Sequence, residues 1–518
     1  MIGEELKYRI RQSFGHVPTA EQELAIGVFA DFMTCHDSHA VMVLRGSAGT
    51  GKTTLAGAIV RAMTSLRQKM VLLAPTGRAA KVFSLYAGSA AFTIHRRIYR
   101  QKQQGGAEAS EQVQAGEPVS GMRSMMGRFE LGFNAARDTL FIVDEASMIA
   151  NQGFSDSAFG SGYLLDDLVS FVYGSDQNCR LLLIGDNAQL PPVGEESSPA
   201  LSASMLRSYG LQVYESDLNE VLRQAQESGI LYNATRIRNL SSPIGPLSSS
   251  VRCAAALPLP KIRFHGFPDI QLTPGDELIE SLGTSYSRAG LDDTIVITRS
   301  NKRANIYNQG IRRTVLDRED ELCRGDRLMI VRNNYFWLTA NGQLPDRPEE
   351  TQAQAGKANI PFLANGDMAT VQRVRNVHEQ HGFRFAEVTL LFPDYDDYEL
   401  TATVLLDTLT SESPSLTREQ QQQLFERVME DYADIPRKAD RMKKLKEDRY
   451  YNALQVKFAY AVTCHKAQGG QWSHVYIDQG YMTDEMLSTD YLHWLYTAFT
   501  RATDRLFLVN WPRTQVEE

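Results

Sequence analysis

The sequence predicts an α/β protein built on parallel sheets. Short apolar runs recur along the first part of the chain, and each ends in residues suited to binding or activating a ligand. Strands of a parallel sheet show this pattern when the ligand lies beyond their carboxyl ends. The runs are residues 41–44, 70–73, 139–143 and 180–184. A second set, which predicts a second domain of the same class, comprises residues 294–298, 458–463, 475–477 and 506–509.

The chain changes character between the members of the second set. Four β-like runs follow one another without helical patterns between them, which predicts a small antiparallel barrel or sheet inserted into the second domain. These runs are residues 327–331, 368–374, 385–391 and 400–406. Residues 415–450 are rich in Glu, Gln, Lys and Arg, and we expect one or two surface helices there whose charge is solvated.

Composition narrows the class of protein. A chain of 518 residues is too long for one core and should divide into roughly three or four domains. No run reaches the length of a membrane span, and the start "MIGEELKYRI" lacks the apolar core of a signal peptide, so we expect a cytoplasmic protein. The five cysteines are scattered without a Cys-x-x-Cys pair, which indicates neither a disulfide framework nor a zinc site. The net charge of −8 argues against binding nucleic acid through bulk charge, although a local basic groove remains compatible with it.

The stretch "GSAGTGKTT" fits the phosphate-loop pattern Gly-x-x-x-x-Gly-Lys-Ser/Thr. In this pattern backbone N–H groups surround phosphate oxygens, the lysine neutralises charge and the hydroxyl after it binds Mg²⁺. The alternative is a flexible Gly/Ser turn before an ordinary helix, but the apolar run before it and the helical composition after it favour a phosphate site. The predicted nucleotide-binding residues are Gly46, Ser47, Ala48, Gly49, Thr50, Gly51, Lys52, Thr53 and Thr54, with Thr53 as a Mg²⁺ ligand.

Polar residues follow two further runs. In "LFIVDEASM", Asp144 is predicted to hold Mg²⁺ and Glu145 to polarise the attacking water, as carboxylates at such strand ends do in phosphate-loop enzymes. A helix N-cap is the alternative for this pair. In "LLIGDNAQLPPVG", Asp186 and Gln189 end another run, and Gln189 is placed to sense the γ-phosphate or the water. A polar turn is the alternative there.

The order of these blocks resembles superfamily 1 helicases, and within them the 1B branch of RecD-like and Dda-like proteins. The further matching blocks are "VPTAEQELAI", "APTGRAAK", "TIHRRI", "LNEVLRQ", "VTCHKAQGGQW" and "YTAFTRATDRL", and the resemblance extends with gaps over residues 19–509. It implies ATP and Mg²⁺ as cofactors. It also implies that Gln22 reads the adenine, that Gly469 lies on the nucleotide side, and that Arg223 and Arg501 reach the γ-phosphate; a surface ion pair is the alternative for Arg501.

Hydroxyls, loop N–H groups and basic side chains bind phosphates without reading sequence, and aromatic rings stack on bases. The residues expected to bind a nucleic-acid strand combine these properties with the resemblance. They are Pro75, Thr76, Gly77, Arg78, Phe92, His95, Arg96, Thr463, His465 and Lys466. A lone histidine is more often packed or solvated than functional, so for His95 and His465 this alternative stays open.

The resemblance implies two RecA-like phosphate-loop motor domains, each with a parallel sheet flanked by helices. The first is expected at 1–95 and 138–240, interrupted at 96–137 by a hairpin or loop arm with a strand-separating wedge; the second is expected at 261–322 and 451–518. An SH3-like β module at 323–414 and the charged helices at 415–450 interrupt the second. In the arm, the Gly105-Gly106 pair lacks flanking alternating strands, and "RFELGFN" (128–134) offers a wedge aromatic. In the module, Tyr335, Phe336 and Trp337 either press on the displaced strand or the wedge, or simply pack the module.

The predicted activity is that of an ATP-dependent DNA helicase moving along single-stranded DNA, with the resemblance implying 5′ to 3′ movement and unwinding by closure of the two motor domains. The expected partners are single-stranded DNA and its junctions with duplex, together with accessory replication or repair proteins, around a monomeric motor associated with the nucleoid. Two alternatives remain: a translocase or remodelling ATPase that never separates a duplex, and a nucleotide-dependent binding subunit of a RecD-type repair or recombination complex.

Overall fold

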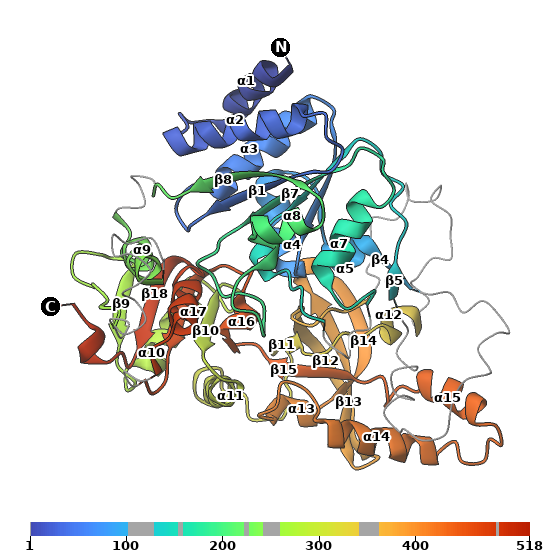
Figure 1. Ribbon diagram of the computed structural model, residues 1–518. Helices are drawn as coiled ribbons and strands as arrows, with labels where there is room; N and C mark the ends of the chain where they lie inside the picture. Colours follow the sequence, from blue (N-terminus) through green and yellow to red (C-terminus); the bar gives the residue numbers. More distant parts are fainter. Residues whose placement is uncertain are drawn as a thin grey trace. The chain divides into compact units, whose positions relative to one another are not determined.

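The computed structural model describes residues 2–101, 129–153, 159–221, 227–241, 259–340, 362–482 and 486–517. The chain forms two compact units. Unit 1 comprises Met1–Ala256 and Ser488–Thr497, and unit 2 comprises Leu257–Leu487 and Ala498–Glu518. Within the described ranges, every helix is too short or too polar to cross a lipid bilayer. Each unit contains one of the two predicted parallel sheets (Figure 1).

The sheet of unit 1 has six parallel strands in the order β3-β2-β6-β7-β1-β8. The four predicted runs are its four central strands, which are buried on both faces and therefore read as continuous apolar stretches. The edge strands β3 and β8 are partly exposed and carry polar residues, so no apolar run marked them. The bounds are β1 Ala40–Gly46, β2 Lys69–Ala74, β3 Ala91–Thr93, β6 Thr139–Val143, β7 Arg180–Gly185 and β8 Gln212–Leu218.

Two helices of unit 1, α1 and α2, precede the first strand, and the others follow strands. A core of apolar side chains from α1, α2, α3 and the sheet is buried on one side, with Ile10, Phe29 and Ile59 at 0–1% exposure. Helix α2 starts with a capping box between Thr19 and Gln22. The bounds are α1 Ile2–Phe14, α2 Ala20–Thr34, α3 Lys52–Ser65, α4 Gly77–Ala87, α5 Ile94–Ile98, α7 Leu164–Tyr173, α8 Ala203–Ser208 and α9 Gly229–Ser241.

Unit 1 also holds most of a helix from the end of the chain, α17 (Thr489–Phe499). The Leu190 N–H, in the loop after β7, donates to Thr497 Oγ1 at 2.8 Å, and the Ala188 carbonyl lies 2.8 Å from a ring nitrogen of His493. The sequence had placed all of 451–518 in the second domain. Residues 488–497 instead pack with unit 1, because their partners lie about three hundred positions earlier in the chain, as the 307-residue separation of Leu190 and Thr497 shows.

The inserted arm begins as a two-stranded antiparallel ribbon of β4 (Tyr99–Gln101) and β5 (Phe129–Leu131). The sequence carried no clear hairpin signal here, because strands of three residues are too short to show an alternating pattern. Aromatic rings of His95, Tyr99, Phe129 and Phe159 pack together at the base of the ribbon. Gly105, Gly106 and Arg128 lie outside the described residues.

The sheet of unit 2 has five parallel strands in the order β16-β10-β17-β18-β9. The prediction of one strand over 458–463 was wrong: Phe458 ends a strand of the barrel, and the parallel sheet takes only the three residues of β16. Both pieces are buried, so the apolar run shows no break between them. The bounds are β9 Ile270–Thr273, β10 Thr294–Thr298, β16 Ala461–Thr463, β17 Trp472–Asp478 and β18 Ala502–Val509, with helices α10 Leu278–Arg288, α11 Asn301–Gly310 and α16 Cys464–Ala467.

The β-like runs form a closed five-stranded barrel (Figure 1). Four strands match the predicted runs, and the fifth, β15, lies beyond the range 323–414 expected for the module. Strands β14 and β15 are parallel, which requires a crossover between them, and the predicted charged helices provide it. The bounds are β11 Arg327–Ile330, β12 Met368–Gln380, β13 Phe383–Phe392, β14 Tyr398–Leu405 and β15 Leu454–Phe458, with helices α12 Phe336–Ala340, α13 Asp407–Thr410, α14 Arg418–Glu430 and α15 Lys438–Lys446.

The aromatic triplet of the module packs against it. The Trp337 Nε1–H donates to the Asn452 carbonyl at 2.8 Å, and the Tyr335 ring lies 5.2 Å from that of Phe362. Trp337 also contacts the apolar core of the barrel region. These contacts favour the packing alternative for Tyr335 and Trp337.

Asp367, just before β12, links the barrel's stability to pH. Its carboxylate accepts hydrogen bonds from the Ala364 N–H (2.7 Å) and the Tyr395 hydroxyl (2.8 Å), yet burial raises its pKa from 3.8 to about 7. Between about pH 4 and pH 7 the folded protein keeps a proton that the unfolded chain has released. The free energy of unfolding therefore falls as pH rises through this window.

Replacing Asp367 with Asn should remove this loss. Between pH 5 and pH 8 the wild type is expected to lose about 2–3 kcal/mol more stability than Asp367→Asn, at about 1.4 kcal/mol per pH unit of the shift. Urea unfolding of both proteins at the two pH values measures the difference. An identical pH dependence in the two proteins would contradict the assignment.

Candidate functional site

The predicted phosphate loop connects β1 to α3 and has the backbone that an anion site needs. Gly49 and Gly51 adopt φ values of 77° and 80°, which glycine tolerates best. A Cβ on Gly46 would lie 2.7 Å from Lys52 Cγ and 2.9 Å from Thr50 Oγ1, so the loop closes only around a glycine. The first residues of α3 follow at once, with the Thr53 and Thr54 side chains exposed. The free N–H groups of a helix N-terminus there attract a phosphate.

Lys52 is held in the loop by oxygen atoms. Its Nζ donates to the Gly46 carbonyl, lies 3.4 Å from the Ser47 carbonyl and lies 3.9 Å from Asp186 Oδ2. Asp186 follows β7 and is 3% exposed. A carboxylate this buried requires compensating donors, which here include the Ala188 N–H at 2.9 Å.

Tyr496 supplies a second donor to Asp186 and a contact to the loop. Its hydroxyl donates to Asp186 Oδ2 (2.6 Å) and accepts the Ala48 N–H (2.8 Å). Burial raises the pKa of this phenol well above its usual value, so it stays protonated. Sequence reasoning missed Tyr496 as a site residue although it opens the "YTAFTRATDRL" block.

Two other contacts to the loop come from different elements. Arg238 of α9 donates to Ser47 Oγ, which brings a cation to the loop that no motif spacing had indicated. The Gln22 Nε2 donates to the Thr50 carbonyl at 3.0 Å, while its Oε1 accepts the Thr19 N–H at 2.9 Å. Gln22 thus braces the loop from α2, and its contact with adenine stays a prediction.

Asp144 ends β6 with both carboxylate oxygens hydrogen-bonded. Oδ1 accepts the Glu145 N–H at 2.9 Å, and Oδ2 accepts the hydroxyl of Tyr86 from α4. Burial raises the pKa of Asp144, and these two donors and the charge of Lys52 act against that shift. Glu145 has a φ of 52°, a left-handed conformation that is strained for a non-glycine residue and is typical of functional sites.

Gln189 carries a buried acceptor that the described residues leave unsatisfied. The residue is 7% exposed, and its Oε1 has no hydrogen-bond partner in the described part of the chain. An orphaned polar atom in such a place is explained by a ligand or water. Together, this acceptor, the glycine-lined loop, Lys52 and Asp144 fit a nucleoside triphosphate with Mg²⁺.

Two predicted strand-binding segments meet at the same edge of the sheet. Strands β2 and β3 pair side by side, with Ala74 opposite Thr93, so the segments that follow them are neighbours. Thr76 and Thr93 cap α4 and α5 through their side chains. The Phe92 ring is 36% exposed, and the Arg96 guanidinium lies 5.4 Å from its centre. The structure therefore brings Pro75, Thr76, Gly77 and Arg78 next to Phe92 and Arg96.

His95 has surroundings that favour packing. Its ring lies 4.8 Å from that of Phe159 and 5.6 Å from that of Tyr99. Burial lowers the pKa of His95 to about 4, so the ring is neutral near pH 7 and unsuited to holding a phosphate by charge.

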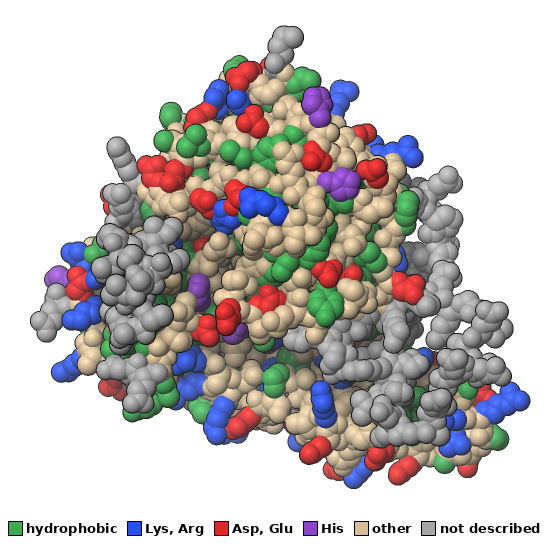
Figure 2. Space-filling model, in the orientation of Figure 1, with side chains coloured by type: hydrophobic (Ala, Val, Ile, Leu, Met, Phe, Trp, Pro, Cys, Tyr) green, Lys and Arg blue, Asp and Glu red, His purple; other side chains and the backbone are tan. Residues whose placement is uncertain are grey.

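Acidic and basic side chains are interspersed over the face of unit 1 seen in Figure 2, in line with the low net charge.

In unit 2 the predicted residues lie at the end of β16 and just before β18. Thr463, His465 and Lys466 lie at the carboxyl end of β16; burial lowers the pKa of His465, and that of Lys466 to about 8. Arg501 is 3% exposed and donates to the Gly470 carbonyl at 3.2 Å, next to the predicted Gly469. This burial contradicts the surface ion pair considered for Arg501.

Arg223 lies outside the described residues, and its contact with the γ-phosphate stays a prediction.

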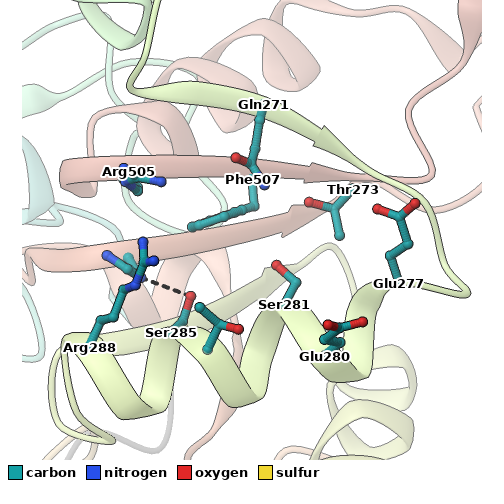
Figure 3. Close-up of a pocket in the computed structure, with 11 residues that line it drawn as sticks. Gln271, Thr273, Glu277, Glu280, Ser281, Ser285, Arg288, Arg505 and Phe507 are labelled. Atoms are coloured by element: carbon teal, nitrogen blue, oxygen red, sulfur yellow. Dashed lines mark hydrogen bonds between the residues drawn. The ribbon is translucent and has the colours of Figure 1, made fainter.

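Unit 2 also has a separate pocket of about 320 Å³ between α10 and strands β9 and β18 (Figure 3). Two of its lining residues, Ser281 and Ser285, hydrogen-bond with the Tyr476 hydroxyl at 2.8 Å and 2.7 Å. Arg288 and Arg505 lie toward one end of the pocket and Glu277 and Glu280 toward the other. None of the predicted nucleotide or strand residues lines it.

Comparison with known proteins agrees with this geometry. Residues 30–241 match the family described as AAA domain, and residues 458–509 match the UvrD-like helicase C-terminal domain. The ATP-dependent RecD2 DNA helicase of Deinococcus radiodurans is 29% identical over 205 residues, 40% of this chain and 22% of that protein. The ATP-dependent DNA helicase dda of Enterobacteria phage T4 is 27% identical over 199 residues, 38% of each chain.

The matches thus span well under half the length of these two relatives. Among solved structures, Pif1 helicase from Bacteroides in complex with ADP-AlF3 and single-stranded DNA aligns with 97% of this chain and 95% of its own, at 14% identity and a TM-score of 0.42. The first match covers the sheet of unit 1 and the second covers β16, β17 and β18 of unit 2; the site residues other than Gln22 lie within the matched segments. These matches support the resemblance of the chain to superfamily 1B helicases of the RecD-like and Dda-like group.

Proposed function

We propose that the protein is an ATP-dependent DNA helicase that moves along single-stranded DNA, in the 5′ to 3′ direction that its family implies. One observation carries the proposal. The nucleotide residues Lys52, Asp144 and Gln189 and the strand segments after β2 and β3 share one edge of the unit 1 sheet. The groups proposed for hydrolysis and for strand binding are therefore attached to the same sheet.

Each residue at this edge has a chemical task in the proposed reaction. Lys52 and the α3 N-terminus bind the phosphates, and Thr53 and Asp144 hold the metal. Mg²⁺, when bound with ATP, neutralises charge on the β- and γ-phosphates. Glu145 polarises the attacking water, and Gln189 uses its free acceptor to orient it. Arg501 and Arg223 stabilise charge on the γ-phosphate.

Movement along DNA needs a strand site that responds to the nucleotide. In our proposal Thr76 in unit 1 and Thr463 in unit 2 grip and release the backbone in turn as ATP is bound and hydrolysed. Phe92, with its exposed ring, stacks on a base. In our proposal the barrel is the SH3-like module that the resemblance implies, and it takes part in unwinding.

The arm offers a specific wedge residue. Phe133 follows β5 and is 81% exposed, whereas Phe129 on β5 is buried in the aromatic cluster at the arm's base. An exposed ring on an anchored ribbon is suited to splitting base pairs, and this favours a helicase over a translocase that leaves duplexes intact. A binding subunit of a RecD-type complex would instead show tight nucleotide binding with slow hydrolysis on its own.

Replacing Lys52 with Ala should reduce ATP hydrolysis at least roughly 100-fold, the loss typical of removing one electrostatic stabiliser of a transition state. Colorimetric phosphate release with saturating single-stranded DNA measures the effect. Lys69→Ala, which removes an exposed lysine at the opposite end of β2, is the matched control and should keep the parent rate. Hydrolysis by Lys52→Ala at the parent rate would exclude this loop as the catalytic site.

Phe133→Ala should slow unwinding several-fold while leaving DNA-stimulated hydrolysis intact, because the ring acts only on the duplex. Strand separation is followed by fluorescence on duplexes with a 5′ or a 3′ single-stranded tail. The wild type should unwind the 5′-tailed substrate, and Phe133→Tyr, which keeps a ring, should retain the rate. Equal unwinding by wild type and Phe133→Ala would remove Phe133 as the wedge; no unwinding of either duplex by an active ATPase would favour a translocase.

A further inference from the structure

Tyr86 joins parts of unit 1 that are distant in sequence. It lies near the end of α4, and its hydroxyl donates to Asp144 Oδ2. Its ring packs on Phe83, with 5.1 Å between centres, and it is partly buried against the core of unit 1. Its carbonyl lies so close to α3 that a Cβ on Gly57 would be 3.1 Å from it. One residue thus contacts both the helix that follows the phosphate loop and the proposed metal carboxylate.

The other end of α4 holds a proposed strand segment. Thr76 caps the helix through its side chain, and Gly77 and Arg78 form its first turn. Ala79, Ala80, Phe83 and Ala87 are buried along α4, so the helix is packed along its length and would move as one body. An 11-residue helix spans about 16 Å. The helix therefore forms a short, packed connection from Thr76 to Asp144.

Two hydrogen-bond donors hold the Asp144 carboxylate, and one of them belongs to α4. One oxygen is fixed by the neighbouring Glu145 N–H, which moves with Asp144 itself. The other accepts the Tyr86 hydroxyl, which belongs to α4. A shift of α4 when a strand binds at Thr76 would therefore turn or release this carboxylate.

We propose that Tyr86 is a positioning residue that couples the strand segment at Thr76–Arg78 to the metal carboxylate Asp144. This inference rests on the proposed function and goes beyond it by naming the residue that transmits the signal. Neither the phosphate-loop pattern nor any of the matching blocks includes Tyr86. The alternative is that Tyr86 only packs α4 against the core.

Tyr86→Phe separates the two, because it keeps the ring and removes only the hydroxyl. Coupling is measured by binding rather than turnover. The affinity for a fluorescein-labelled, unstructured DNA 20-mer is determined by anisotropy with and without Mg²⁺ and a non-hydrolysable ATP analogue. The affinity for the analogue is then measured with and without DNA. Each experiment gives a coupling factor, which is the ratio of its two affinities, and thermodynamic linkage requires the two factors to be equal.

In the wild type we expect the factor to differ from 1 by roughly 5- to 150-fold, the usual range for coupled sites. In Tyr86→Phe it should fall to near 1, with the melting temperature little changed. Tyr209→Phe is the matched control: it removes a similar tyrosine-to-aspartate hydrogen bond, to Asp166, and should keep the wild-type factor. Gly57→Ala keeps the hydroxyl but presses on the Tyr86 carbonyl, and should lower the factor partly.

The outcomes separate this inference from the function on which it rests. A coupled wild type with an equally coupled Tyr86→Phe overturns the role of Tyr86 alone. Equal losses of both affinities at an unchanged factor also overturn it, because they indicate packing only. A wild type that binds DNA and nucleotide without any coupling overturns the inference together with the proposed motor.

Discussion

The parallel arrangement of the unit 1 sheet is the constraint on which the site depends. Because β1, β2, β3, β6 and β7 run in one direction, the segments after all five strands emerge at one edge. The phosphate loop, Asp144, Gln189 and the strand segments after β2 and β3 are these continuations. A strand of opposite direction would carry its segment to the far edge. The chemistry at this edge is therefore a consequence of the topology, with individual side chains adjusting it.

The edge also carries a buried charge, which determines how its side chains are held. Lys52 and Asp186 lie 3.9 Å apart, and Tyr496 and the Ala188 N–H supply donors to the carboxylate. A buried carboxylate without such donors would be costly. An arriving phosphate would compete with Asp186 for Lys52 and with Tyr496 for the Ala48 N–H. A nucleotide that binds the loop must therefore replace these contacts.

Much of this arrangement was predictable from the sequence, and the reasons for the exceptions are physical. The four central strands of unit 1 were predicted because burial on both faces makes them apolar, while the edge strands β3 and β8 carried no such signal. The run 458–463 misled because a barrel strand and a sheet strand follow each other with the same apolar character. The phosphate loop was predictable because its chemistry fixes residue types at fixed spacing.

Tyr86, Tyr496 and Arg238 were not predicted as site residues for a different reason. Each reaches the site from another element: Tyr86 is 58 positions from Asp144, Arg238 is 191 from Ser47, and Tyr496 is 448 from Ala48. No local pattern records contacts of this kind. His95 shows the converse, since its motif indicated a strand contact whereas its neighbours in space are aromatic rings that keep it neutral.

The most direct test of the account is the rate of ATP hydrolysis by the purified protein with and without unstructured single-stranded DNA, with an RNA of equal length beside it. If nucleotide and strand share one sheet edge as proposed, DNA should raise the rate strongly. A protein that binds ATP but hydrolyses it at the same rate with DNA, with RNA and with neither would contradict the account and indicate a subunit that depends on a partner.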